Sequence, residues 1–126
     1  MIMDLLRTYL NENCAKKDPV LDWLERETHY RCVHPRMLGG EPLGSLLTML
    51  VKMIRPQNIL EIGTFTGYSA ISMARGLSEG GRIDTIEIFD EHNDLIIEAF
   101  RRSGMEERIT LHTADALEEI PKMHRQ

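Results

Sequence analysis

The sequence predicts an α/β fold in which a parallel sheet carries helices on both faces and follows a helical N-terminal segment. From residue 58 onward, short apolar runs alternate with segments of helical periodicity, in the order strand, helix, strand, helix, strand. This alternation is typical of right-handed crossovers between parallel strands. Before residue 57 the apolar residues recur at helical spacing instead. We therefore divide the chain into a helical segment, 1–56, and an α/β unit, 57–126.

Length and composition indicate one globular domain. The chain has 126 residues, of which 42% are apolar and 28% charged, and a net charge of -5. This composition excludes disorder, and the negative charge gives no support for broad binding to nucleic acid or anionic membrane. No apolar run approaches the roughly 20 residues that span a bilayer, and the N-terminus does not resemble a secretory signal. We expect a cytoplasmic protein in which Cys14 and Cys32 are reduced thiols.

Three helices are predicted in the N-terminal segment. The first has an apolar stripe that begins at Ile2, and the second starts with Asp18 as N-cap and Pro19 in the first helical position. A loop at Gly39 and Gly40 precedes the third helix. The strongest amphipathic pattern of the chain marks this third helix, which Pro42 opens and Arg55-Pro56 closes. We expect these helices to cover the sheet or to pack in a dimer.

The α/β unit is predicted to contain three strands and the helices that connect them. Apolar runs predict strands at 58–62, 82–88 and 108–113. Glycines and a capping acid mark the helices, which we expect at 67–76, from Asp90 to Gly104, and from Asp115 to the residue before Pro121.

The segment that follows the first strand carries the most specific chemistry. It reads Glu61-Ile-Gly63-Thr-Phe-Thr-Gly67-Tyr-Ser69 and joins the strand to the next helix. Gly63 permits a tight turn and close approach of a ligand, because no side chain covers its backbone. In an open parallel sheet, ligands bind beyond the carboxyl ends of the strands. The junction therefore predicts a binding site, although each glycine alone is equally compatible with an ordinary turn.

Two acids at the ends of strands narrow the choice of ligand. Glu61 lies at the end of the first strand, and Glu87 lies at the end of the second, 20 residues after Gly67. A carboxylate in the second position accepts hydrogen bonds from a ribose diol, whereas Glu61 would repel a pyrophosphate. Asp115 offers a third contact or simply caps a helix. Phe65 and Tyr68 are compatible with either a crevice wall or core packing.

Together these motifs resemble the class I S-adenosylmethionine-dependent O-methyltransferases, in particular the catechol and caffeoyl-coenzyme A group, which have a Rossmann-like fold. The resemblance extends from Met37 to Pro121. It rests on four segments: MLGGEPLGSLL at 37–47, LEIGTFTGYSAISMA at 60–74, GGRIDTIEI at 80–88 and ITLHTADALEEIP at 109–121. They are similar to the loop over the methionine end, the first motif, the ribose-binding strand and the adenine-side turn. The unit 57–126 would be the first half of such a domain, and 1–56 would include the cofactor-closing loop.

The resemblance implies that eight residues bind the cofactor, S-adenosyl-L-methionine. By the part of the cofactor they would contact, they are Gly39, Glu61, Gly63, Thr64 and Ser69 at the methionine end, Phe65 along the crevice, Glu87 at the ribose and Ala116 at the adenine. The implied activity is transfer of a methyl group to a hydroxyl of a small, catechol-like acceptor. Three alternatives stay open: a hydroxylated uridine in transfer RNA as acceptor, a non-catalytic cofactor-binding module, and, less favoured, an NAD-dependent dehydrogenase.

The sequence departs from the family pattern in two ways. Ala114 stands where the family commonly has glycine, and the chain stops at Gln126, before the later strands of family members. Those strands normally supply the general base and the ligands of a divalent, Mg2+-like metal. We therefore assign no catalytic residue and no metal ligand, and expect a fragment that is inactive alone. The full protein is expected to be a homodimer. A chain truly ending here would expose a strand edge and should associate, swap elements or aggregate.

Overall fold

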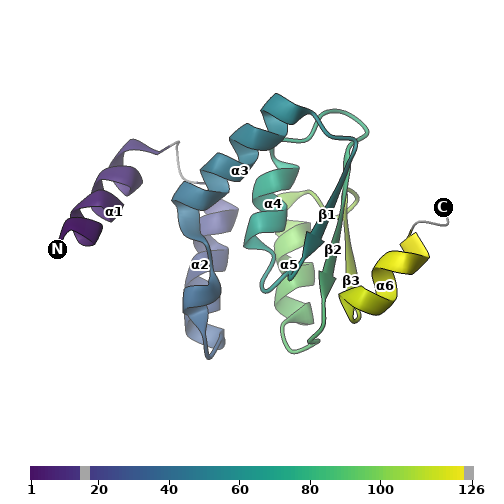
Figure 1. The fold of residues 1–126 in the computed structure, drawn as a ribbon. Coiled ribbons are helices and arrows are strands. Elements are labelled where there is room, and N and C mark those ends of the chain that lie inside the picture. The colour runs from purple at the N-terminus through teal and green to yellow at the C-terminus, as the bar shows by residue number, and fades with distance from the viewer. Residues whose placement is uncertain (15–17, 124–126) are drawn as a thin grey trace.

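The computed structural model describes residues 1–14 and 18–123, and Figure 1 shows their arrangement. A three-stranded sheet lies between two helices that pack directly on one face and a short helix on the other. The elements, in chain order, are α1 (Ile2–Asn13), α2 (Pro19–Arg31), the 3-10 turn η1 (Pro35–Met37), α3 (Gly40–Ile54), β1 (Asn58–Ile62), α4 (Tyr68–Ala74), β2 (Arg82–Glu87), α5 (Asn93–Ser103), β3 (Ile109–Thr113) and α6 (Ala116–Met123).

The sheet is parallel, with the strand order β1-β2-β3. The predicted α/β fold is confirmed, and the bounds of β1 are those that the apolar run predicts. The register pairs Glu61 with Thr85 and Glu87 with Thr113. Since side chains alternate along a strand, Glu61, Thr85 and Glu87 all lie on the same face of the sheet. Within the described residues, β1 pairs with β2 alone, so its other edge is unpaired.

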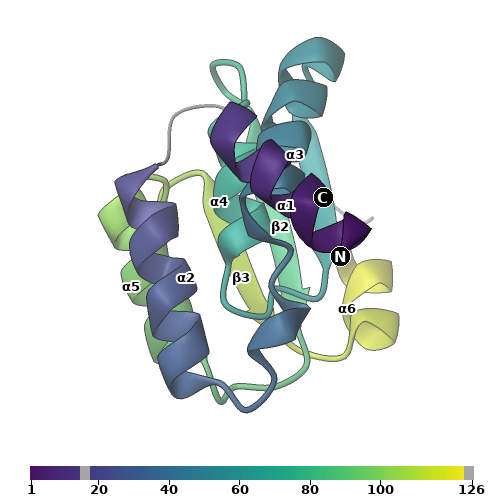
Figure 2. The ribbon, with the colours of Figure 1, turned by 90° about the vertical axis from the view of Figure 1, so that its left-hand side faces the viewer.

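The core lies between the sheet and the pair α4 and α5. Ile83 of β2, Ile71 of α4 and Ile96 of α5 are fully buried there. Figure 2 shows α2 beside α5, and Leu24 of α2 is fully buried in the same core. The β-branched and leucine side chains that gave the periodic patterns thus form one contiguous core, which burial of apolar area stabilises.

The opposite face of the sheet carries α6 (Figure 1). His112 of β3 joins the two: its Nε2 lies 2.8 Å from an Asp84 oxygen on β2, and its Nδ1 lies 3.4 Å from a Glu119 oxygen on α6. The predicted helices on both faces are therefore confirmed. Ile62 at the unpaired edge strand remains 65% exposed on this face.

The start of α2 follows the sequence prediction. The Asp18 side chain accepts hydrogen bonds from the backbone N–H groups of Val20 and Leu21, and Pro19 occupies the first helical position. The second oxygen of Asp18 lies 2.8 Å from Nε of Arg75, which follows α4. One carboxylate thus caps α2 and joins it to the end of α4.

Several predicted bounds are wrong. The helix predicted at 67–76 is α4, Tyr68–Ala74, while β2 ends at Glu87 instead of 88 and β3 begins at Ile109 instead of 108. Three further helix bounds differ. Asp90 does not cap α5, which begins at Asn93 with His92 as N-cap, because the Asp90 carbonyl accepts the Asn93 N–H in a preceding turn. The last helix runs through Pro121 to Met123 instead of ending before the proline. The third helix begins at Gly40, so Pro42 stands within its first turn, where a missing N–H costs no intrahelical bond.

The helix α3 packs closely on α4. An added Cβ at Gly44 would lie 2.7 Å from the Ser72 hydroxyl, and the Thr48 hydroxyl donates to the Ser72 carbonyl at 2.6 Å.

The stretch Pro35–Ile54, which includes α3, is long and apolar enough to cross a membrane by length and composition alone. This differs from the expectation that no stretch of the chain is. A single such stretch is weak evidence, since a helix with one packed apolar face passes the same test.

The outermost helix, α1, contacts α3 and buries none of its own residues (Figure 1). Its apolar stripe is therefore exposed, and it consists of Ile2, Leu5, Leu6, Tyr9 and Leu10.

We predict that Gly76→Ala lowers the free energy of unfolding by about 1–3 kcal/mol. Its Cβ would lie 2.6 Å from the Thr48 carbonyl oxygen and 2.9 Å from Cβ of Val51, so the contact between α3 and the end of α4 must open. The matched control is Gly39→Ala, whose Cβ would meet the mobile end of the Leu43 side chain. Urea unfolding of both variants measures the difference, and equal losses would contradict this account.

Candidate functional site

The site predicted from the sequence lies where the carboxyl ends of β1 and β2 meet the loop to α4. Gly63 has φ 90° and its N–H donates to the Ile86 carbonyl of β2 at 2.8 Å, so the loop leaves the sheet without losing its pairing. No atom lies within 4 Å of an added Cβ at this glycine, which leaves its backbone open to a ligand. Gly67 has φ 95°, and an added Cβ there would lie 2.8 Å from the Phe100 ring of α5.

Glu61 is held by two hydroxyl groups. Ser69 of α4 donates to its Oε2 at 2.5 Å, and Thr85 of β2 donates to its Oε1 at 2.7 Å. Because the Thr85 hydrogen is used in that bond, the Thr64 hydroxyl, 2.6 Å away, is the donor to the Thr85 oxygen. The result is a buried relay from Thr64 through Thr85 to the carboxylate. Its two bonds to the carboxylate fix the direction in which that group points.

The Glu61 carboxylate is costly to bury. Burial raises its pKa above the ordinary 4.5, and the charge of Glu87 raises it further, while the hydrogen bonds from Ser69 and Thr85 lower it. Burial is the largest of these effects, so the net direction is upward. A nearby positive charge would relieve both unfavourable contributions, and the described part of the chain places no cationic side chain in contact with this carboxylate.

Glu87 ends β2 and connects two loops. Its Oε2 accepts the backbone N–H of Phe65 at 2.8 Å, and its Oε1 accepts that of Phe89 at 3.2 Å. Phe65 has φ 53°, a left-handed conformation that this bond helps to hold. Each carboxylate oxygen has two lone pairs, so both can accept a further bond from a ligand hydroxyl.

A small cavity of about 140 Å³ adjoins the loop after β1. The loop before α3 forms one wall with Gly39 and Gly40, and the other wall contains Gly63, Phe65 and Ser69. The side chains that line the cavity are uncharged in the part of the chain that the structure describes. Two carboxylates contact residues of its lining: Glu61 accepts a hydrogen bond from the Ser69 hydroxyl, and Glu87 accepts one from the Phe65 N–H. The cavity thus suits a ligand without phosphate groups.

The structure brings most of the predicted site residues together, although their binding roles stay predictions. Gly39, Gly63, Thr64, Phe65 and Ser69 line the cavity, and Glu61 lies directly behind Ser69. The Thr64 hydroxyl itself is bound to that of Thr85. Two other predicted site residues are placed differently: Glu87 lies at the adjoining strand end, and Ala116 begins α6 beyond β3.

Sequence reasoning missed two polar residues near the site. Thr85 lies between Ile83 and Glu87 on the same face of β2, and this alternation was a usable signal that it faces Glu61. Asn93 begins α5; its Nδ2 donates to the Thr113 hydroxyl at 3.1 Å, while its buried Oδ1 has no partner among the described residues. No local pattern marks Asn93, because its position depends on how α5 docks beside β3.

Metal-ligating side chains do not converge within residues 1–14 and 18–123. No group of three or more histidine, cysteine or acidic side chains there has the arrangement that a metal ion requires. The thiols of Cys14 and Cys32 are free and belong to different regions of the fold.

Comparison with known proteins identifies the family. The sequence matches the family described as O-methyltransferase over residues 11–126. The chain belongs to this O-methyltransferase family. The resemblance and the Rossmann-like methyltransferase fold that the sequence predicted are thereby confirmed.

Three similar proteins show how much of the family this O-methyltransferase chain spans. A catechol O-methyltransferase of Niastella koreensis is 34% identical over 80 residues, which are 64% of this chain and 36% of that protein. A caffeoyl-CoA O-methyltransferase of Stellaria longipes is 31% identical over 86 residues, 67% of this chain and 36% of that protein. The crystal structure of an O-methyltransferase from Bacillus cereus in complex with SAH has 30% identity and a TM-score of 0.89, covering 100% of this chain and 58% of its own. The chain therefore spans between about a third and about three fifths of these relatives.

We predict that Glu61→Gln becomes more stable relative to the wild type as the pH rises from about 4 to about 7. A carboxyl whose pKa is raised by folding supports the folded state below its ordinary pKa of 4.5, and this support is lost as the pH rises through the raised value. The amide does not ionise, so it escapes that loss. Urea unfolding at several pH values measures the effect.

The matched control is Glu118→Gln, which removes an exposed carboxylate from α6. Its stability should follow the wild type over the same pH range. A Glu61→Gln profile parallel to the wild type would show that the carboxylate is not under the electrostatic penalty described here.

Proposed function

We propose that this chain binds S-adenosylmethionine and belongs to an enzyme that transfers its methyl group to a hydroxyl of a small molecule. The single observation that carries the proposal is the pair Glu61 and Glu87 on one face of the sheet, beside an open glycine turn and an uncharged cavity. These two hydrogen-bond acceptors favour a ligand with positive charge and a ribose, and their negative charge disfavours a phosphate. The SAH-bound relative from Bacillus cereus and the catechol and caffeoyl-CoA relatives support the same choice.

In this proposal the cofactor would supply an electrophilic methyl group, and the residues of this chain position it. The Glu61 carboxylate, held by Ser69 and Thr85, would face the ammonium end of the cofactor. Glu87 would accept the ribose hydroxyls while its bonds to the Phe65 and Phe89 amides keep it in place. The open backbone of Gly63 would admit the cofactor close to the sheet.

The acceptor is proposed to be a hydroxylated aromatic compound, by analogy with the catechol and caffeoyl-CoA relatives. The described residues provide no metal cluster, so we assign no cation ligand and no general base within them.

The transfer-RNA alternative depends on a local basic patch at Arg101 and Arg102, and both side chains have partners within the chain. Arg101 pairs with Glu106, and Arg102 pairs with Glu98 and stacks over Trp23. No observation therefore favours that alternative. The family assignment likewise leaves the dehydrogenase alternative without support.

Calorimetric titration with S-adenosylhomocysteine tests the proposal. We expect the wild type to bind and Glu87→Ala to bind roughly 10- to 100-fold more weakly, since the variant loses two charge-assisted hydrogen bonds to the ribose. Glu87→Gln keeps an acceptor for the Phe65 amide and separates loss of the loop contact from loss of the charge. The control Glu118→Ala should bind as the wild type does. Absence of binding by the wild type refutes the proposal, and unchanged binding by Glu87→Ala refutes the role of that residue.

We further propose that the protein forms a homodimer through α1. The apolar stripe of this helix is exposed along its length, with Leu5 67% and Tyr9 61% exposed. Leu46 and Met53 of α3, the helix that α1 contacts, are exposed as well. Exposed apolar surface of this extent is typical of protein interfaces, and a second copy would cover both helices.

We predict that the wild type elutes in size-exclusion chromatography with light scattering at twice the monomer mass, and that Leu5→Glu elutes as a monomer. A charge in the apolar stripe would be buried without a partner in the dimer. Asn11→Glu places the same charge on the opposite side of α1 and should leave the dimer intact. A monomeric wild type, or equal disruption by both substitutions, contradicts the proposal.

A further inference from the structure

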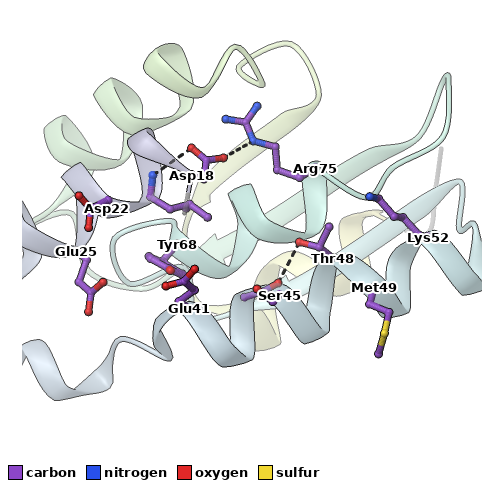
Figure 3. A pocket seen from close by; sticks show the side chains of 12 residues that line it. Asp18, Asp22, Glu25, Glu41, Ser45, Thr48, Met49, Lys52, Tyr68 and Arg75 are labelled. Carbon is purple, nitrogen blue, oxygen red and sulfur yellow. Dashed lines mark hydrogen bonds and ion pairs between the residues drawn. The ribbon is translucent and has the colours of Figure 1, made fainter. Parts of the chain in front are cut away.

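A second and larger cavity, of about 390 Å³, lies between α2 and α3 with α4 at its base (Figure 3). Leu21 and Glu25 of α2 form one wall, and Glu41 and Met49 of α3 form the other. Tyr68 of α4 lines this cavity and also the smaller cavity at the Gly63 loop. Gly44 of α3 also lines both, so the two cavities are neighbours.

The Tyr68 hydroxyl is the first indication that the larger cavity takes a ligand. The residue is 6% exposed and lines the cavity, yet its hydroxyl has no hydrogen-bond partner within the part of the chain described by the structure. The hydroxyl is not among the polar atoms shut off from solvent without a partner, so it opens to the cavity and is available to a ligand there. Burial and the surrounding carboxylates raise the pKa of Tyr68, so the hydroxyl stays protonated and can both donate and accept.

The charges around the cavity are the second indication. Asp18 is paired with Arg75, and Asp22 is paired with Arg26. Glu25 and Glu41 are only partly exposed, and neither carboxylate has a cationic partner among the described residues. Both carboxylates are close enough to Tyr68 to raise its pKa. Among the residues that the structure describes, the cavity lining thus has an excess of negative charge next to the Tyr68 hydroxyl.

The far end of the cavity has the opposite sign. Lys52 lies 11 residues after Glu41 on α3, which places it about 16 Å further along the helix. Figure 3 shows Glu25 and Glu41 on one side of the cavity and Lys52 on the other. Between them, Leu21 and Met49 provide apolar contacts. A ligand with one positive charge at one end and an apolar body matches this arrangement, whereas a second positive charge would face Lys52.

We propose that this cavity is a binding site for a small organic monocation, whose ammonium group is held by the Glu25 and Glu41 carboxylates and the Tyr68 hydroxyl. The apolar body of the ligand lies against Leu21 and Met49. The site is separate from the proposed cofactor site, because neither acid lines the cavity at the Gly63 loop. It does not depend on the proposed methyl transfer.

The test compares benzylamine with benzyl alcohol, two probes of equal shape that differ in the ammonium group. Binding to the full chain is measured by titration at constant ionic strength, with methyl NMR of the methionines to locate the probe. We expect benzylamine to bind at least tenfold more tightly than benzyl alcohol, and the Met49 methyl signal to shift while that of Met3 on α1 does not. Equal binding of the two probes, or no shift at Met49, would overturn the proposal.

Conservative variants assign the contacts. Glu25→Gln and Glu41→Gln should each weaken benzylamine binding about three- to tenfold, and Tyr68→Phe should weaken it about threefold. The control Glu118→Gln removes the same charge from an exposed site on α6 and should have no effect. Binding of S-adenosylhomocysteine to Glu25→Gln should be unchanged, so failure of this proposal is distinguishable from failure of the proposed function. Equal weakening by Glu118→Gln would show a nonspecific charge effect and overturn the assignment.

Discussion

The carboxylate of Glu61 imposes the constraint on which the geometry of the candidate site depends. A partly buried acid next to a second acid, Glu87, is unfavourable unless its charge is hydrogen-bonded or met by a cation. The fold supplies the hydrogen bonds from two different elements, Ser69 of α4 and Thr85 of β2. Within residues 1–14 and 18–123, no cationic side chain meets this carboxylate. The site is therefore incomplete in an electrostatic sense, and this is the physical reason for expecting a positively charged ligand.

The backbone around the acids is shaped by the same requirement. The turn after β1 combines the open Gly63 with Phe65, a left-handed residue whose N–H is bound by Glu87. Glu61 thus accepts hydrogen bonds from side-chain hydroxyls, whereas Glu87 accepts them from the backbone amides of Phe65 and Phe89 and so holds the two loops. Behind the loop, Gly67 fits against Phe100 of α5, which anchors the turn to the core. Burying the Glu61 carboxylate destabilises the fold, whereas the packing of Gly67 against Phe100 stabilises it.

The strands and the position of the site could be predicted from the sequence, because they depend on local signals. The apolar run of β1 and the glycines around the loop specify their conformations within a few residues. The start of α5 could not be predicted in this way: Asp90 is a good capping residue, but its carbonyl forms a turn that delays the helix to Asn93. The continuation of α6 past Pro121 could not be predicted either, because a proline usually ends or kinks a helix. The alternation along β2 could have placed Thr85 on the face of Glu61, whereas the cavity at Tyr68 depends on helices distant in sequence.

A crystal structure of the protein with S-adenosylhomocysteine tests the central claim most directly. The account predicts the ribose hydroxyls within hydrogen-bond distance of the Glu87 carboxylate, and the amino group on the side of Glu61 and Ser69. The ligand backbone should pass over Gly63. A nucleoside bound elsewhere, or bound at this edge of the sheet without contact to either acid, would contradict the claim that the two carboxylates form the cofactor site.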